Sequence, residues 1–266
     1  MATLPNPLSS PADAGLQLPP GTFVDATIDE VWHEPLLWYA DAPASPGSWA
    51  ALRTSGRPVG LLPVLIDGGM RDAWPEAWDL GPARTSYPGD HDAEEVLSEA
   101  WEAYAPEELG LDESSADWPG LAPVPAEAAA AEDPDTSAAG LADFLTDTSS
   151  PMTGLRAALV PARRSADIAA AIGWSGPLNH ENDVARLCAV LRSWEDRFGA
   201  RVVVLGFDTM VVSVSRPPTT IAESEALAAE HFAFCPDNIQ QSTLNSLDTY
   251  AEKAVLNQQT WAFWWD

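Results

Sequence analysis

The chain has 266 residues, of which 46% are hydrophobic and 20% are charged, so a collagen, a coiled coil and a wholly disordered chain are excluded. Its 40 acidic residues outnumber its 13 basic residues and give a formal net charge of −27. A surface this acidic repels phosphate backbones, and direct binding of nucleic acid is therefore not expected.

Cysteine content and targeting signals predict a cytoplasmic protein. The two cysteines, Cys188 and Cys235, do not make a disulfide framework. The first residues lack a basic segment followed by an apolar run, so no signal peptide is predicted. No apolar stretch approaches the ~20 residues that a helix needs to cross a bilayer, and no membrane association is expected.

The acidic residues are concentrated in the middle of the chain. Residues 72–147 hold 20 acids and one base, whereas the segments before and after each have a net charge of −4. A salt-adapted protein would spread its acids evenly, so the pattern argues against halophily. Within this region, residues 122–150 are rich in alanine, proline and acids. We expect a mobile linker there, because such a composition buries too little surface to offset its ordering entropy. The alternative is a short alanine helix at 126–131, too short to stand alone.

The first half of the chain predicts an extended arm followed by an α/β region. Residues 1–21 are rich in proline and serine and form the expected arm. In residues 22–121, apolar runs at 36–40 and 61–66 have the length of strands, with a short helix candidate at 45–52 between them. Pro63 interrupts the second run and predicts a sheet edge or a bulge, because proline donates no ladder hydrogen bond.

An acidic helix is predicted at residues 92–104. Asp92 stands at the N-cap position, and apolar residues recur at helical spacing behind it. The opposite face carries glutamates that we expect to be exposed to solvent. These glutamates are Glu94, Glu95, Glu99 and Glu102.

Residues 151–266 show the clearest pattern, in the order β-α-α-β-β-α-α-β. The strands are expected at 155–160, 201–205, 210–215 and 261–265, and the long helix at 182–198 is expected to begin at an Asn182 N-cap and to end at Gly199. Thr220 and Glu223 have the spacing of a capping box that opens a later helix. The region predicts an α+β domain, a mixed β-sheet with packed helices.

Three segments of this region are distinctive, namely WSGPLNHENDVARLCAVLRSWEDRFGARVVVLGFDTMVVSVSRPPTT, AAEHFAFCPDNI and the terminal WAFWWD. Together they resemble the bacterial family called domain of unknown function 4253. The upstream LLWYADAP and DWPGLAP are similar to N-terminal regions of actinobacterial members. The family has no established activity, so the resemblance implies a domain boundary and little chemistry. Family members often carry tryptophan directly after PDNI, where this sequence has Gln240.

His231 and Cys235 are four residues apart, a spacing that places both on one face of a helix. One interpretation is a thiolate nucleophile with an imidazole base. However, Cys235 lies at a helix C-terminus, where the helix dipole disfavours a thiolate, and free cysteine is usually buried. A metal site that adds Cys188 or His180 lacks recognisable ligand spacing. We therefore predict no catalytic residue, no metal and no cofactor.

Several residues remain as candidates for binding. Asp208 lies in the predicted hairpin turn, where it either shapes the turn or acts as a functional carboxylate. His231, Asp237 and Asn238 are the other polar candidates. The chain has twelve tryptophans, most of them expected in the core, but three lie in acidic sequence and are expected to be partly exposed as protein contacts. These three are Trp74, Trp78 and Trp118.

Charge and composition together favour a non-enzymatic, protein-binding module. The expected partner is a protein with a basic surface, and one version is an antidote-like protein that neutralises a basic toxin or nuclease. The alternative is an enzyme that acts on a small substrate in a pocket near His231 and Asp208. A pocket that gathers His231, Asp208 and Asp237 would favour the enzyme, and exposed tryptophans beside an acidic patch would favour the binding protein.

Overall fold

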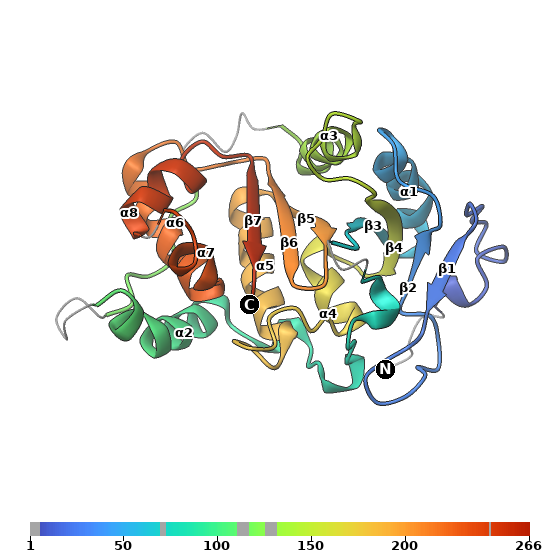
Figure 1. Cartoon of the computed structure of the whole chain (residues 1–266), viewed down its shortest axis with the longest axis horizontal. Helices are drawn as coiled ribbons and strands as arrows, with labels where there is room; N and C mark the ends of the chain where they lie inside the picture. Colours follow the sequence, from blue (N-terminus) through green and yellow to red (C-terminus); the bar gives the residue numbers. More distant parts are fainter. Residues whose placement is uncertain (1–5, 70–72, 111–116, 126–131, 245) are drawn as a thin grey trace.

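A seven-stranded β-sheet forms the centre of the molecule (Figure 1). The structure is a computed structural model that describes residues 6–69, 73–110, 117–125, 132–244 and 246–266. The strand order is β1-β2-β4-β3-β5-β6-β7, and every neighbouring pair is antiparallel apart from β3 and β5. The mixed sheet confirms the predicted α+β class. The strands are β1 (Gly21–Val24), β2 (Leu37–Ala40), β3 (Leu61–Ile66), β4 (Arg156–Pro161), β5 (Ala200–Leu205), β6 (Thr209–Val214) and β7 (Thr260–Trp264).

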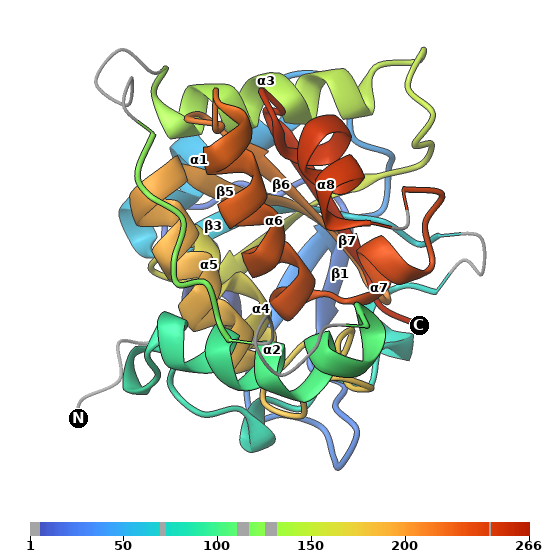
Figure 2. The same ribbon diagram turned by 90° about the vertical axis from the view of Figure 1, so that its left-hand side faces the viewer.

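Helices cover both faces of the sheet. One face packs against α1 (Ser48–Gly56) and α3 (Pro134–Thr146), and the other packs against α4 (Ile168–Ile172) and α5 (Val184–Phe198). The helices α6 (Ile221–Phe234) and α2 (Ala93–Glu108) lie next to α5. Figure 2 shows α2 and α3 at opposite ends of the molecule. The short helices α7 (Asp237–Gln240) and α8 (Leu247–Tyr250) and a π-helical turn at Ala251–Val255 precede β7. Within the described ranges, no helix has both the length and the apolar character of a membrane span.

Alternating side chains of the strands divide the core into two clusters. In β4, Ala157 and Leu159 face α1 and α3, whereas Ala158 and Val160 face α4 and α5. This is the two-residue period of a strand that is covered on both faces. The runs of apolar residues in β3 and β4 follow from the same double coverage.

The N-terminal segment and the proposed domain boundary differ from the expectation. In the described part of the arm, Leu8 and Leu16 are buried in the cluster under α1, so this part is packed rather than extended. β3 comes from the N-terminal half of the chain and lies between β4 and β5 of the C-terminal half. The expected boundary at residue 151 therefore does not separate two sheets.

The expectation of a mobile linker at 122–150 is wrong for residues 134–146, which form α3. Asp133 caps the helix by accepting hydrogen bonds from the backbone N–H groups of Asp135 and Thr136. Ala138 and Ala142 are buried, and their small side chains let α3 lie close to β5 and β6. The alanines of α3 therefore form the face that packs on the sheet. The alternative helix at 126–131 lies outside the described residues.

The sequence predicted a sheet edge or a bulge at Pro63, but Pro63 lies inside the sheet, and β3 pairs with β4 there without a register shift. β3 pairs with β4 along its whole length but with β5 only at Leu65 and Ile66. At Pro63 the side of β3 that faces β5 has no strand partner, so a residue without an N–H is tolerated there. On the other side of the gap, the N–H of Val202 donates to Ser165 Oγ at 2.9 Å. The two strands thus diverge, and the gap between them is flanked by side chains.

The C-terminal part follows the predicted element order. The capping box of Thr220 and Glu223 is present, and Gly199 ends α5 with a φ of 63°. The N-cap of α5 is Asp183 and not Asn182. β7 lies at the edge of the sheet, with Trp261 and Trp265 buried on one face and Trp264 half-buried on the other.

The buried carboxylate of Glu230 in α6 connects this helix to α5 and to the segment 117–125. Glu230 is fully buried and accepts two hydrogen bonds from Arg197, at 2.7 and 2.6 Å. It also accepts from Trp194 Nε1 at 2.7 Å and from the backbone N–H of Ala122 at 2.6 Å. Four donors thus depend on one side chain.

Replacing this carboxylate tests its role in stability. We expect Glu230→Ala to lower the free energy of unfolding by about 3–5 kcal/mol, because it removes the charged partner of the half-buried Arg197 and leaves two N–H donors without their acceptor. Equilibrium urea unfolding followed by tryptophan fluorescence measures the loss. The control is Glu225→Ala on the exposed side of α6, expected within about 0.5 kcal/mol of the parent protein. Equal midpoints for the two variants would contradict the assignment.

Candidate functional site

His231 is a core residue in the structure. It is fully buried, and its ring centroid lies 4.6 Å from that of Trp261 and 5.0 Å from those of Trp194 and Phe263. A hydrogen bond of 3.1 Å joins Nδ1 to the hydroxyl of Tyr250. Burial lowers the pKa of His231 to about 3, and repulsion by Arg197 adds to the effect. A neutral imidazole without exposed surface cannot contact a substrate here.

Cys235 is buried and protonated. Its Sγ donates to the carbonyl oxygen of Trp264 at 3.0 Å, and burial raises the pKa of the thiol well above its ordinary value. Burial likewise raises the pKa of Cys188 to about 12. The geometry therefore gives no support to a thiolate nucleophile.

Asp237 and Asn238 hold the end of the chain against the fold. Asn238 accepts from the N–H of Trp264 at 3.1 Å and donates to the carbonyl of Ala262 at 2.6 Å, which continues the hydrogen-bond ladder along the edge of β7. Asp237 Oδ2 lies 2.9 Å from His180 Nε2 and accepts from the N–H of Asp266 at 3.0 Å. Both residues are buried and structural in this arrangement.

Asp208 does not join them in a pocket. It is half-buried in the loop between β5 and β6, and its backbone carbonyl accepts from the N–H of Trp265 at 3.0 Å. Because His231 has no exposed surface, a pocket shared by His231 and Asp208 is not formed.

The expectation that three tryptophans are partly exposed is correct for two of them. Trp78 is buried, with Nε1 donating to the carbonyl of Ala73 at 2.9 Å. Trp74 is half-buried and stacks on Tyr39, and Trp118 is half-buried with its ring edge-on to Trp101. The partly exposed rings are therefore engaged in packing.

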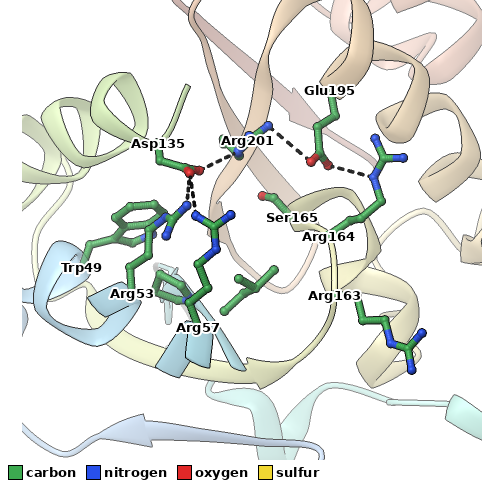
Figure 3. A pocket seen from close by; sticks show the side chains of 11 residues that line it. Trp49, Arg53, Arg57, Asp135, Arg163, Arg164, Ser165, Glu195 and Arg201 are labelled. Atoms are coloured by element: carbon green, nitrogen blue, oxygen red, sulfur yellow. Dashed lines mark hydrogen bonds and ion pairs between the residues drawn. The ribbon is translucent and has the colours of Figure 1, made fainter. Parts of the chain in front are cut away.

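The structure gathers a cluster of arginines that the sequence analysis did not single out. A cavity of about 70 Å³ opens where β3 and β5 diverge, between α1, the start of α3 and the β4–α4 loop (Figure 3). Five of the twelve arginines of the chain line it, together with two carboxylates. The charged lining residues are Arg53, Arg57, Arg163, Arg164, Arg201, Asp135 and Glu195, and the others are Trp49, Leu62, Pro63 and Ser165.

Asp135 holds three of the guanidinium groups in place. It lies in the first turn of α3, where its Oδ2 pairs with Arg53 of α1 and, at 3.4 Å, with Arg57. Its Oδ1 accepts from Nε of Arg201 in β5 at 2.8 Å. One carboxylate thus pairs with three arginines and balances the charge of one.

Glu195 of α5 borders the other side of the cavity. Its Oε1 lies 3.4 Å from Nη1 of Arg201, and its Oε2 lies 3.6 Å from Nε of Arg164. Oε2 also accepts from the N–H of Ala166 at 3.1 Å, which fixes the β4–α4 loop. The two carboxylates are therefore occupied within the cluster.

The cavity keeps an excess of positive charge. Burial lowers the pKa of Arg53, and repulsion by Arg57 and Arg201 adds to the shift. Arg163 is exposed and has no hydrogen-bond or ion-pair partner within the described parts of the chain. Nε1 of Trp49 is buried without an acceptor among the same residues. Donors thus outnumber acceptors in this cavity, which is what an anion requires.

A match to a known protein family includes part of the cavity lining. Residues 156–266 match the model of a family described as Domain of unknown function (DUF4253). The resemblance of the C-terminal part is thereby confirmed. No curated protein and no solved structure matches the chain. The DUF4253 segment supplies Arg163, Arg164 and Arg201, whereas Arg53 and Asp135 come from residues before it, so the cavity lies between the matched and the unmatched parts.

The pH dependence of stability tests the burial of His231. Because the pKa of His231 is about 3 in the folded protein and ~6.5 in the unfolded chain, the unfolded state binds the extra proton as the pH falls below ~6.5. Stability is therefore lost on acidification. We expect this residue to account for about 2 kcal/mol of the loss between pH 7 and pH 5.

The comparison is between the parent protein and His231→Gln. Urea unfolding at pH 7 and pH 5 should show a smaller loss for the variant, since the other titrating groups are the same in both proteins. An equal loss in the two proteins would show that His231 titrates normally in the folded state.

Proposed function

We propose that this protein binds a small ligand through an oxyanion group, a carboxylate or a phosphate, held in the arginine-lined cavity. The observation that supports it is that five arginines line one cavity of a chain with a net charge of −27. Guanidinium groups match carboxylate and phosphate oxygens with paired hydrogen bonds.

A purely structural role explains the cluster less well. One ion pair would be enough to tie α3 to β5, and the bond between Asp135 and Arg201 already does so. Arg57 shares the single carboxylate of Asp135 with two other arginines, and Arg163 pairs with neither lining carboxylate. Mutual repulsion makes such a cluster unfavourable until an anion binds, so the excess charge favours a ligand site.

The side chains of the cavity favour binding over catalysis. Arginine stays protonated and cannot serve as a base at neutral pH. Asp135 and Glu195 are engaged in ion pairs, and Ser165 Oγ already accepts from the N–H of Val202. We therefore propose a non-enzymatic protein, with a cytoplasmic location that the two buried free cysteines support.

Titration calorimetry with inorganic phosphate and with acetate at low ionic strength tests the site. Both anions should bind at one site per chain. Arg57→Gln and Arg163→Gln should each weaken binding about tenfold, the loss of roughly 1.4 kcal/mol of charge-assisted hydrogen bonding. Both side chains are exposed, so the fold should be retained.

The matched control is Arg84→Gln, which removes another exposed arginine, one that pairs with Asp29 outside the cavity. Its affinity for phosphate should equal that of the parent protein. Equal weakening in all three variants would indicate a general charge effect, and the absence of binding by both anions would refute the proposal.

A second candidate function is the binding of a basic protein, favoured by the exposed face of α2. Glu94, Glu95 and Glu102 are exposed and have no ion-pair partner among the residues that the structure describes. Glu99 on the same face pairs with Arg186. The partner would have a basic surface, as in the antidote-like version of this function, and would reach α2 at the end of the molecule away from α3 (Figure 2).

This candidate predicts binding that weakens steeply with salt. The affinity of a basic protein that co-purifies with the chain should fall between about 50 and 500 mM salt, because the Debye length shortens. The variant with Glu94, Glu95 and Glu102 changed to glutamine should bind more weakly at low salt and depend less on salt.

A control variant neutralises the same number of exposed acids elsewhere, at Glu30, Asp41 and Glu252. It should retain most of the affinity if α2 is the contact. An affinity that is indifferent to salt and to the substitutions in α2 would exclude this candidate.

A further inference from the structure

We infer that the ligand is a phosphomonoester whose uncharged, polar body lies in the groove between α1 and α3. The inference rests on the proposed oxyanion site and adds the class of the anion and the place of the rest of the ligand. It depends on the charge of the cavity, on a second cavity that continues from it, and on Trp49.

The charge of the cavity fits a dianion better than a monoanion. Its five arginines exceed its two lining carboxylates and Asp196, which pairs with Arg164, by two positive charges. A carboxylate ligand would neutralise one of these charges, whereas a phosphomonoester carries about −1.5 to −2 at neutral pH and offers three terminal oxygens. Three oxygens can also accept from more donors than the two oxygens of a carboxylate.

The cavity and the space next to it differ in size, which suits a ligand with a small anionic head, its phosphate, and a larger body. The arginine cavity, at about 70 Å³, has room for a small anionic group and for little more. A wider, open groove of about 420 Å³ continues from it and shares Trp49, Arg53, Arg57 and Asp135 as lining. A ligand with its phosphate in the cavity would therefore extend along this groove.

The groove lining selects an uncharged, polar body. Beyond the shared residues, the groove is lined by small and polar side chains of α1 and α3. Asp133 at the N-cap of α3 is exposed and would repel a second anionic group at the far end of the ligand. The other lining residues are Ala50, Thr54, Thr136 and Ala139.

Trp49 marks the junction of the two spaces. Its side chain lines both of them, it is only 4% exposed, and its Nε1 has no acceptor within the described residues. A buried indole N–H without an acceptor is uncommon in folded proteins and calls for an explanation. A phosphate or ester oxygen at the junction would supply that acceptor once a neighbouring side chain moves off the covered Nε1.

The test compares five compounds by calorimetry, namely glucose 6-phosphate, inorganic phosphate, gluconate, glucose and fructose 1,6-bisphosphate. We expect glucose 6-phosphate to bind about tenfold more tightly than inorganic phosphate, gluconate to bind more weakly than either, and glucose not to bind. Fructose 1,6-bisphosphate should not bind more tightly than glucose 6-phosphate, because Asp133 would repel its second phosphate.

Variants in the groove separate the body from the head. Ala139→Leu should weaken binding of glucose 6-phosphate about tenfold and leave inorganic phosphate within about twofold. Thr54→Gln on α1 tests the opposite wall and replaces Ala139→Leu if that variant fails to fold. The control is Ala103→Leu, an exposed position of α2 far from the groove.

The outcomes distinguish this inference from the proposed function. If neither phosphate nor gluconate binds, the oxyanion site itself is wrong. If inorganic phosphate binds as tightly as glucose 6-phosphate, or if the groove variants weaken both equally, the oxyanion site stands and the assignment of the groove is overturned. If gluconate binds as tightly as glucose 6-phosphate, the phosphate class is overturned.

Discussion

The divergence of β3 from β5 is the constraint on which the arginine-lined cavity depends. The two strands pair in parallel only at Leu65 and Ile66, and before that point they separate. The backbone tolerates the gap because Pro63 has no N–H to satisfy and because the N–H of Val202 donates to Ser165 Oγ. A register shift in β5 between Val202 and Val204 accompanies the separation. Close-packed interiors rarely leave such a space, and here charged side chains border it.

The acidic face of α2 and the arginine-lined cavity lie far apart in the molecule. The acidic face of α2 lies at one end, and the arginines between α1 and α3 lie at the other (Figure 2). At a distance the net charge of −27 repels anions, so only a ligand that reaches the guanidinium groups gains from them. Salt should therefore affect the two proposed interactions differently. A basic partner is attracted from afar by the whole acidic field, whereas an oxyanion depends on short contacts in a partly enclosed cavity, which salt screens less.

Local signals were sufficient for the C-terminal element order and insufficient for the site. The capping box of Thr220 and the glycine at 199 mark helix ends within a few residues, and the structure has both. The choice between Asn182 and Asp183 as N-cap differs by one residue and depends on backbone geometry that composition does not encode. α3 was missed because its buried alanines look like linker residues until β5 and β6 are in place beneath them.

The cavity could not be predicted, since its arginines are scattered from Arg53 to Arg201 and meet only in the folded sheet. The adjacent Arg163 and Arg164, the only neighbouring pair of basic residues in the sequence, were the one local signal.

The side-chain NMR signals of the arginines give the most direct test that the cavity is a ligand site. In a titration with inorganic phosphate, the Nε–Hε resonances of Arg53, Arg163 and Arg201 should shift together and saturate with one dissociation constant. The resonances of Arg84 and Arg216, which lie outside the cavity lining, should stay in place. Shifts that are small, unsaturable and equal across all of these arginines would show that phosphate acts only through ionic strength, and they would contradict a binding site in the gap between β3 and β5.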